Sequence, residues 1–565
     1  MSNKIKYKDK PWVSYYDEGV PEKLVTEEIC LPAMLERTAA EFPQKAALLF
    51  EGYCVTYTKL KEMVDRLATC LAAFGVRKRD SVAILLPNMI QCVVSYFAIL
   101  KIGAIAVMNN PLYSDRELEY QFADSGAKVL ITLDLLGNRM IDLRTKTNIK
   151  QIIYTRIGDY LPFPKNILFP VVAKLKHLSK KVKHAPNVYK WKDVINDYPP
   201  RPPLENINLS DVAMYQYTGG TTGLTKGAIL THKNLSSQVQ HIRVWLPRFR
   251  RGEETILGAL PFFHVFGITT TMNLAVYMGW TDILIIKPHA KPLLDAIKRF
   301  KPTFAPLVPT MYIGIINHPD VNKSDITSIE GCFSGSAPLP LEVIREFEKK
   351  SGSIIVEGYG LTESSPVTHI NPFNGKRKPG SIGLALPDTE CKIVDLKNNK
   401  KEVAVGQIGE LLIKGPQVMR GYLNKPEETR MTLKDGWLHT GDIAKMDNEG
   451  YFYIVDRKKD MIISSGYNVY PRDIEEVLFD NPKIQEAAVI GIPHPKRGEV
   501  AKAFVVLKEG EVADVKEILD FCKDKLAKYK LPAEIDILKE LPKSKVGKVL
   551  KRELREAEIQ KHKGE

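Results

Sequence analysis

Hydrophobic positions in the first hundred residues follow two different periods. Apolar side chains recur at helical spacing over residues 31–42 and 58–74. Residues 81–86 form instead a short continuous apolar run, which is typical of a buried strand. A helical pattern over residues 89–101 and another apolar run over residues 104–108 follow. Because strand, helix and strand succeed each other with short links, the pattern predicts a parallel, doubly wound α/β sheet.

Later parts of the chain extend this pattern and then change it. Further strands are expected at residues 129–132, 152–154, 283–286, 304–307 and 354–357. From Gly409 onward the pattern becomes strands separated by turns, which predicts a β-barrel-like part. Beyond the charged run DRKKD at residues 456–460, short strands mix with helices over residues 474–479 and 515–528.

These patterns, together with a length of 565 residues, predict two domains, because one core rarely grows that large. The fold class is α/β. We expect a large N-terminal domain, residues 1–455, built from doubly wound α/β subdomains plus the β-barrel-like part. A small α+β C-terminal domain is expected over residues 456–565.

Composition places the chain among soluble globular proteins, with 44% hydrophobic and 26% charged residues. The seven cysteines are scattered and show no Cys-x-x-Cys spacing, which favours a reducing cytosol without disulfides or structural zinc. The N-terminal residues MSNKIKYKDKPW contain no apolar signal region, and no window is long and apolar enough to span a membrane. A cytoplasmic protein is therefore expected.

The net charge of +14 suits polyanionic ligands such as ATP and CoA, or an anionic membrane face. Nucleic acid is the rival partner, but zinc-finger spacing, an RNA-binding aromatic motif and a helix-turn-helix pattern are all missing from the sequence. We expect no nucleic-acid partner.

Residues 165–183 stand out because they carry six lysines and no acidic residue. Their apolar residues fall at helical spacing: Leu168, Val171, Val172, Leu175, Leu178 and Val182. This predicts a basic amphipathic helix, with Pro170 in its first turn or breaking its start. Two interpretations stay open: peripheral association with the inner face of an anionic membrane, or packing on the body with the lysines in water.

The densest candidate chemistry is YTGGTTGLTKG at residues 217–227. Glycines let the backbone approach a ligand closely, while hydroxyls, backbone N–H groups and a lysine can surround phosphate oxygens. It is not a Walker A loop, because Lys226 follows Thr225 and precedes Gly227. A flexible surface turn is the alternative. The residues expected to contact a nucleotide are Thr218, Gly219, Gly220, Thr221, Thr222, Gly223 and Lys226.

A second candidate segment reads EGYGLTE at residues 357–363. Tyr359, between Gly358 and Gly360, offers an aromatic face for adenine. Thr362 can donate to an α-phosphate, and Glu363 is a hard oxygen ligand suited to Mg²⁺. The spacing differs from G-x-G-x-x-G, so a dinucleotide-binding fold is not indicated.

Three further positions are ambiguous when taken alone. The histidine of PFFHVFG, His264, suits the wall of an acyl pocket but, taken alone, is more typical of a satisfied core histidine. The small-residue turn Gly335-Ser336-Ala337 lets a flat base approach, yet most such turns are ordinary. Asp442 can accept two hydrogen bonds from ribose hydroxyls, with Arg457 adding a third contact.

Together these segments resemble the adenylate-forming superfamily of acyl-CoA synthetases, luciferases and adenylation domains. They occur in the order and spacing of that superfamily, and the similarity extends over residues 12–554. The chain departs from the usual pattern at Gly219, where serine is common, and at Thr225, where proline is common. Val546 likewise replaces a common serine or threonine. The segments NPLY at 110–113 and RELE at 116–119 are similar to bacterial-type long-chain fatty acid–CoA ligases.

The resemblance implies roles that the residues alone do not establish. His264 would gate the acyl site, and the turn at Gly335, Ser336 and Ala337 would contact adenine. Lys459 would be the hinge between domains, and Gly466 would line the pantetheine tunnel. Lys548 would be the adenylation lysine. The implied catalytic residues are Lys548, Thr362, Glu363 and His264, with Mg²⁺ held by Glu363 and Thr218.

The implied activity is ATP-dependent conversion of a long-chain fatty acid to acyl-AMP and then, with CoA, to acyl-CoA. Alternatives are a medium-chain or aryl acid–CoA ligase, an acyl-AMP ligase serving a carrier protein, and a fatty acid binder without catalysis. A homodimer is possible by family analogy only.

Overall fold

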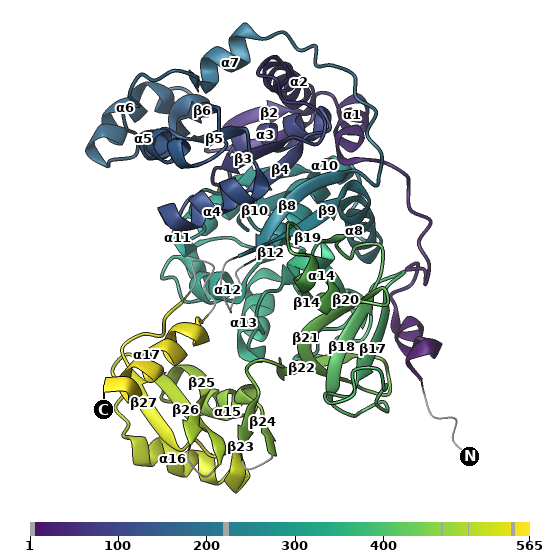
Figure 1. Cartoon of the computed structure of the whole chain (residues 1–565), viewed down its shortest axis with the longest axis vertical. Coiled ribbons are helices and arrows are strands. Elements are labelled where there is room, and N and C mark those ends of the chain that lie inside the picture. Colours follow the sequence, from purple (N-terminus) through teal and green to yellow (C-terminus); the bar gives the residue numbers. More distant parts are fainter. Residues whose placement is uncertain (1–5, 219–224, 465–466, 495–496, 544–548, 565) are drawn as a thin grey trace. The chain divides into compact units, whose positions relative to one another are not determined.

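The computed structural model describes residues 6–218, 225–464, 467–494, 497–543 and 549–564 (Figure 1). Contacts within the chain divide it into two compact units. The larger comprises Trp12–Glu390 and Ile413–Leu438, and the smaller comprises Met1–Pro11, Cys391–Leu412 and His439–Glu565. The border predicted after residue 455 stays a prediction, because compactness by contacts does not test which segment moves as a domain.

The larger unit contains two sheets whose central strands run parallel. In the first, β14, β13, β12, β10, β11 and β1 are parallel neighbours, while β16, β15 and β2 pair antiparallel at the edges. In spatial order, its strands are β16 (Leu384–Ala385), β15 (Val367–Ile370), β14 (Ile354–Gly360), β13 (Gly331–Ser334), β12 (Phe304–Leu307), β10 (Thr255–Gly258), β11 (Thr281–Leu284), β1 (Ala46–Phe50) and β2 (Tyr53–Thr56).

The second sheet has eight strands. Two of them, β9 and β19, form the edge that carries residues of the predicted site. Strands β8 to β7 are parallel, whereas β9 pairs antiparallel with β8 and β19 pairs antiparallel with β9. In spatial order, its strands are β19 (Gly421–Tyr422), β9 (Lys226–Thr231), β8 (Val212–Thr218), β4 (Ile105–Met108), β3 (Ser81–Leu85), β5 (Val129–Leu133), β6 (Gln151–Thr155) and β7 (Val188–Lys190).

Helices of the larger unit cover these sheets. They are α1 (Leu31–Glu41), α2 (Tyr57–Ala73), α3 (Ile90–Lys101), α4 (Asp115–Ser125), α5 (Asp134–Leu143), α6 (Lys165–Leu175), α7 (Trp191–Asp197), α8 (His232–Trp245), α9 (Val265–Gly267), α10 (Leu274–Met278), α11 (Ala290–Phe300), α12 (Pro309–Ile316), α13 (Leu341–Ser351) and α14 (Pro426–Thr432). A π-helical turn, Ile268–Asn273, joins α9 to α10.

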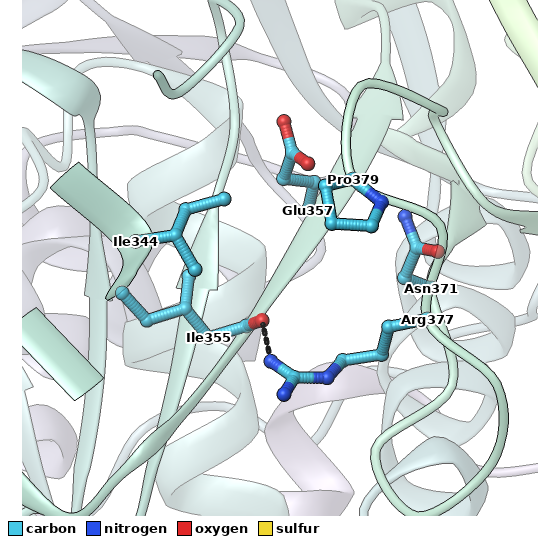
Figure 2. Close-up of a pocket in the computed structure, with 6 residues that line it drawn as sticks. All are labelled: Ile344, Ile355, Glu357, Asn371, Arg377 and Pro379. Atoms are coloured by element: carbon cyan, nitrogen blue, oxygen red, sulfur yellow. Dashed lines mark hydrogen bonds between the residues drawn. The ribbon is translucent and has the colours of Figure 1, made fainter. Parts of the chain in front are cut away.

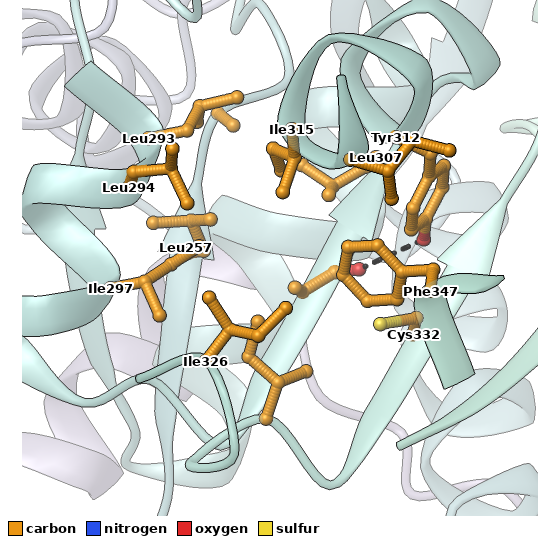
Figure 3. Close-up of a cluster of buried hydrophobic side chains, with 14 of the residues drawn as sticks. Leu257, Leu293, Leu294, Ile297, Leu307, Tyr312, Ile315, Ile326, Cys332 and Phe347 are labelled. Carbon is orange, nitrogen blue, oxygen red and sulfur yellow. Dashed lines mark hydrogen bonds between the residues drawn. The ribbon is translucent and has the colours of Figure 1, made fainter. Parts of the chain in front are cut away.

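The core of the nine-stranded sheet shows why the apolar periods produce this packing. Leu293, Leu294 and Ile297 lie on one face of α11 because their spacing matches the helical repeat. They meet Leu257 and other strand residues beneath α11, α12 and α13 in one buried cluster (Figure 3). A comparable cluster joins α4 and α5 to the eight-stranded sheet. By contrast, α3 is buried along nearly its whole length.

The β-rich segment predicted from Gly409 forms a five-stranded sheet in the order β17-β18-β21-β20, with β22 beside β21. Its strands are β17 (Glu390–Val394), β18 (Gly409–Lys414), β21 (Trp437–Met446), β20 (Leu433–Lys434) and β22 (Phe452–Arg457).

The α+β part of the smaller unit has the strand order β24-β23-β26-β25, with β27 parallel to β26. Its elements are β23 (Ile462–Ser464), β24 (Tyr467–Val469), α15 (Pro471–Phe479), β25 (Ile484–His494), β26 (Gly498–Leu507), α16 (Val515–Lys523), β27 (Glu534–Leu538) and α17 (Lys551–Gly564). The predicted α/β class with a smaller α+β part is confirmed.

Some predicted bounds were wrong. The strand expected at residues 283–286 is Thr281–Leu284, and the helix expected to reach residue 528 ends at Lys523. The basic helix ends at Leu175 and not near residue 183, and residue 170 lies in its middle. It ends there because His177 adopts a left-handed conformation, with φ of 51°, and the Leu178 N–H returns to the Ala173 carbonyl at 2.8 Å.

Candidate functional site

The predicted phosphate loop is closed at its base by the antiparallel pair β8–β9. Thr218 lies directly opposite Lys226, and Tyr217 lies opposite Gly227. The Tyr217 hydroxyl donates to Asp124 Oδ2 at 2.8 Å, and Gln121 Nε2 donates to Thr225 Oγ1 at 3.2 Å. These bonds attach both ends of the loop to α4. The predicted contacts Gly219, Gly220, Thr221, Thr222 and Gly223 lie outside the described residues.

Glu363 is held against this hairpin by a residue that sequence reasoning missed, Tyr422. The Tyr422 hydroxyl donates to Glu363 Oε1 at 2.6 Å, and its ring centroid lies 5.2 Å from Lys226 Nζ. Tyr422 reaches both because β19 pairs with β9, placing it opposite Ala228. The structure therefore brings Thr218, Lys226 and Glu363 to one corner of the larger unit.

The backbone around Glu363 is fixed independently of its side chain. The Met419 N–H donates to the Glu363 carbonyl at 2.7 Å. Just upstream, a Cβ at Gly360 would lie 1.9 Å from the Pro366 carbonyl oxygen, so any larger residue must displace the backbone there. Thr362 and Glu363 belong to a 3₁₀ turn, Thr362–Ser364, that directly follows β14. These constraints define where both side chains begin.

The predicted adenine-contacting residues lie at the carboxyl ends of two neighbouring parallel strands, β13 and β14. Gly335 follows β13, and Gly358, Tyr359 and Gly360 end β14. Ser336 has a left-handed φ of 71°, which makes a sharp turn beside Ala337. In open α/β sheets, ligands bind outside the carboxyl ends of strands. The geometry thus suits these residues for a planar ligand.

Tyr359 is positioned by a buried histidine. Its ring packs edge-on against His369 with centroids 5.9 Å apart, and the two residues are opposite each other in the β14–β15 pair. Burial lowers the pKa of His369 to about 3, so the ring is neutral at pH 7. The tyrosine therefore has an uncharged support.

A small pocket lies beside Glu357, just before the residues that end β14 (Figure 2). Its lining residues are Ile344, Ile355, Glu357, Asn371, Arg377 and Pro379. The Arg377 guanidinium donates to the Ile355 carbonyl at 2.9 Å and also contacts Glu348. The Glu357 carboxylate accepts from the Gly380 N–H at 3.2 Å. Because these groups are occupied in bracing β14, the pocket adds no contact to the predicted site.

His264 stands at the start of α9, where the Phe266 N–H donates to its Nδ1 at 3.2 Å. Nδ1 is therefore the acceptor nitrogen of this ring in the structure. The next aromatic residue links the two predicted regions, since a Cβ at Gly335 would lie 3.1 Å from Phe266 Cζ. The predicted acyl-gate segment and the predicted adenine turn are therefore adjacent.

Asn88 fixes the backbone that leads into the His264 segment, and it was not identified from the sequence. Its Nδ2 donates to the carbonyls of Gly258 and Leu260 at 2.9 and 2.7 Å, and its Oδ1 accepts from the Phe262 N–H at 2.8 Å. The side chain is 3% exposed. A buried asparagine at the carboxyl end of β3 was the available signal, but its partners lie 170 residues or more away.

The smaller unit holds the predicted ribose contacts. Asp442 and Arg457 are opposite each other in the β21–β22 pair, with Asp442 Oδ1 and Arg457 Nε 3.2 Å apart. The carboxylate is nearly buried, whereas the arginine side chain is 39% exposed. The structure thus places the two predicted ribose residues side by side on neighbouring strands.

Lys459 lies in the turn that follows β22, where the Asp460 and Met461 N–H groups both return to the Arg457 carbonyl. Burial, followed by the nearby Arg457 charge, lowers the pKa of Lys459 to about 8. Gly466 and Lys548, the remaining predicted residues, lie outside the described residues. The roles predicted for all of these residues stay predictions.

The described residues offer a carboxylate to a magnesium ion but no complete set of protein ligands around one. Within the described ranges, no group of three or more His, Cys, Asp and Glu side chains gathers as a metal site. Mg²⁺ commonly uses one or two carboxylates together with substrate phosphates. Glu363, beside the β8–β9 hairpin, offers one such carboxylate.

Comparison with known proteins agrees with this arrangement. The AMP-binding enzyme family matches residues 35–423, and the AMP-binding enzyme C-terminal domain matches residues 473–548. A long-chain-fatty-acid–CoA ligase of Bacillus subtilis (strain 168) is 45% identical over 558 residues, covering 98% of this chain and 99% of that protein. The protein of the same name from Escherichia coli O157:H7 is 38% identical and covers 97% and 98%.

Among solved structures, the anthranilate CoA ligase AuaEII in complex with anthranoyl-AMP superimposes with a TM-score of 0.84 at 27% identity. The superposition covers 99% of this chain and 100% of that chain.

Proposed function

The chain belongs to the AMP-binding enzyme family, and from that membership we propose that it is an ATP-dependent long-chain fatty acid–CoA ligase. The observation that carries the proposal is the corner where Thr218 and Lys226 of the β8–β9 hairpin meet Glu363 through Tyr422. It combines a phosphate loop with a hard oxygen ligand, which is what adenylate formation needs. The substrates are the fatty acid, ATP and CoA.

In the first half-reaction, a fatty carboxylate oxygen attacks the α-phosphorus of ATP, and the bond to the bridging oxygen breaks to release pyrophosphate. Lys226, Thr362 and the N–H groups of the loop stabilise the negative charge that develops on the phosphate oxygens. Glu363 and Thr218 would hold Mg²⁺, which would supply further charge neutralisation. Tyr359 and the turn at Gly335 orient the adenine.

In the second half-reaction, the CoA thiolate attacks the acyl-adenylate carbonyl, and AMP leaves. We assign Asp442 and Arg457 to the ribose, and His264 to the acyl entrance. We also propose that residues 456–565 act as a mobile domain that turns about Lys459 between the steps. Lys548 then serves only the first step and Gly466 only the second.

The primary test measures pyrophosphate release with ATP, Mg²⁺ and fatty acids from C6 to C18, with and without CoA. CoA-dependent turnover that peaks at long chains supports the proposal. Turnover confined to short or aryl acids favours the rival ligases. Release of one pyrophosphate per enzyme, unaffected by CoA, favours an acyl-AMP ligase that serves a carrier protein.

The proposed division of labour has its own test. Lys548→Ala should abolish adenylate formation while sparing thioester formation from supplied acyl-AMP. Equal loss in both half-reactions would reject the role assigned to Lys548.

We further propose that the enzyme associates peripherally with an anionic membrane through α6. The apolar stripe of α6, defined as Ile167, Leu168, Val171 and Leu175, is 58–76% exposed. The opposite face is the one that packs: Ala173 is buried, and Phe169 lies against Gly158. The exposure of the stripe supports the membrane interpretation. Within the residues that the structure describes, no helix is long and apolar enough to cross a membrane.

Positive charge borders this stripe. The basic flank is defined as Lys174, Lys176, Lys180 and Lys181. All four lysines are exposed, and they form no ion pair with another described residue. Exposed apolar residues beside unpaired lysines match the interfacial helices that bind anionic lipids. A substrate that partitions into lipid would be captured at such a surface.

Vesicle sedimentation tests this proposal. Changing the apolar stripe to serine, or the basic flank to glutamine, should each reduce binding to phosphatidylglycerol-containing vesicles roughly tenfold or more. A matched control carries four exposed lysines changed to glutamine elsewhere: Lys397, Lys400, Lys401 and Lys434. Equal losses for flank and control would indicate a general charge effect, and no loss for the stripe variant would reject insertion.

A homodimer also stays a proposal, to be tested by sedimentation velocity.

A further inference from the structure

Tyr422 occupies a position that the proposed reaction does not yet explain. It lies in the two-residue strand β19, about sixty residues from Glu363 and nearly two hundred from Lys226. It is 9% exposed, and its backbone N–H bonds to Thr429 Oγ1 at 2.9 Å. The Leu423 N–H donates to the Gly227 carbonyl at 2.8 Å, and the Arg420 N–H donates to the Ile229 carbonyl at 3.0 Å. The backbone on both sides of Tyr422 is therefore fixed to the hairpin.

The two ends of this side chain serve different neighbours. The hydroxyl donates to Oε1 of Glu363 at 2.6 Å, a length typical of a bond to a charged acceptor. The ring face lies 5.2 Å from Lys226 Nζ, within the range of a cation–π contact. Tyr422 thus contacts both an anion, Glu363, and a cation, Lys226. We call the site formed by Thr218, Lys226, Glu363 and Tyr422 the phosphate corner.

We infer that Tyr422 is a positioning residue that orients the Glu363 carboxylate for a divalent cation and holds Lys226 beside the phosphate loop. The inference rests on the proposed function. With Oε1 occupied by the hydroxyl, Glu363 presents Oε2 as a single, directed oxygen ligand. Outer-shell donors of this kind fix ligand orientation and are expensive to remove.

Protonation is consistent with this role. Burial, together with the adjacent Glu363 carboxylate, raises the pKa of Tyr422 far above its ordinary value. The hydroxyl is therefore the donor in its bond to Glu363.

Two substitutions separate the two functions of the side chain. Tyr422→Phe removes the hydroxyl and keeps the ring, whereas Tyr422→Leu removes both. Tyr312→Phe is the matched control, because its buried hydroxyl donates to the Phe333 carbonyl at 2.9 Å in the core of the same unit. It controls for the loss of a buried tyrosine hydroxyl away from the phosphate corner.

The readout is the shift in melting temperature produced by ATP, titrated with Mg²⁺ and repeated with EDTA. Tyr422→Phe should raise the Mg²⁺ concentration at the midpoint roughly tenfold, the lower end of losses on removing an outer-shell partner. With EDTA, its ATP-induced shift should equal that of the unmodified protein. Tyr422→Leu should weaken the ATP-induced shift even in EDTA, because Lys226 loses its support.

Adenylate formation gives the second readout. The activity of Tyr422→Phe should recover in excess Mg²⁺, as a positioning defect predicts and a folding defect does not. Equal Mg²⁺ midpoints for Tyr422→Phe and Tyr312→Phe would overturn the inference. If no acid supports adenylate formation in the unmodified protein, the proposed function fails, yet the binding titration still decides the role of Tyr422.

Discussion

The phosphate corner and the α6 surface belong to the same unit but are built in opposite ways. At the corner, strands β8, β9 and β19 bring together residues that are far apart in the sequence, and Tyr422 contacts both Glu363 and Lys226. At α6, one local helix packs through Phe169 and Ala173 and leaves its apolar stripe in solvent. Chemistry requires atoms held to a fraction of an ångström, whereas a lipid surface requires only composition and exposure.

The comparison predicts its largest effect for Glu363→Gln. This change keeps the size of the side chain and removes its negative charge, so adenylate formation should fall roughly 10²- to 10³-fold, as for loss of one transition-state contact. Pyrophosphate release measures the change. Vesicle binding should be unaltered, and a fall of less than tenfold would remove Glu363 from the reaction.

Two asparagines extend the comparison to neighbouring segments, because each bridges backbone groups from a distant part of the chain, one in the interior and one at the surface. Asn88→Ala leaves three buried backbone groups near His264 without their partner and should cost about 3 kcal/mol of stability. Asn138→Ala breaks the bonds of α5 to Lys181 and Lys183, beside α6, in contact with water. It should cost under about 1 kcal/mol.

Urea unfolding of both asparagine variants gives the two losses directly. Equal losses would mean that the two regions are equally rigid, contrary to the comparison.

A smaller effect concerns acid stability. The pKa of His369 is lowered to about 3 by burial, while the unfolded chain titrates near the ordinary value of about 6.5. Below pH 6.5 the unfolded chain binds the proton first, so stability is lost progressively from about pH 6.5 down to about pH 3. Between pH 7 and pH 5 this group should contribute a loss of about 2 kcal/mol.

His369→Gln should remove that part of the pH dependence. Unfolding free energies at pH 7 and pH 5 provide the measurement, and an unchanged slope would show that His369 titrates normally in the folded protein.

The smallest expected effect is that of the α6 surface on catalytic turnover. Serine substitutions in the apolar stripe of α6 should change turnover of a micelle-free, short-chain acid less than about twofold, since exposed residues away from special contacts contribute little. A large loss of turnover with this substrate would show that α6 supports the site and would break the comparison.

Much of the fold followed from local patterns. The strands β3, β5 and β12 and the helices α1, α2 and α3 lie within a residue or two of their predicted bounds, because each has a clear period and a clear stop. The α6 helix was predicted too long, since the lysine-rich run continues past the left-handed turn at His177. Apolar spacing alone does not show such a turn.

Whether a residue of the candidate site could be found from the sequence likewise depended on how local its pattern is. Tyr217–Gly227 and residues 357–363 were found because glycines, hydroxyls and charges are dense over a few residues. Tyr422 and Asn88 were not found, because each is a single polar residue whose partners come from distant segments. A short-range pattern cannot report a partner that only strand pairing brings near.

By itself, the sequence determined the α/β class, the glycine- and threonine-rich segment at residues 217–227 and the amphipathic period of α6. Tertiary structure alone decided that Tyr422 joins Glu363 to Lys226, that Phe266 of the predicted acyl-gate segment lies beside Gly335, and that the apolar stripe of α6 faces solvent. The physical reason is that periodicity records which residues share a face. What that face meets depends on how strands distant in the sequence pair in space.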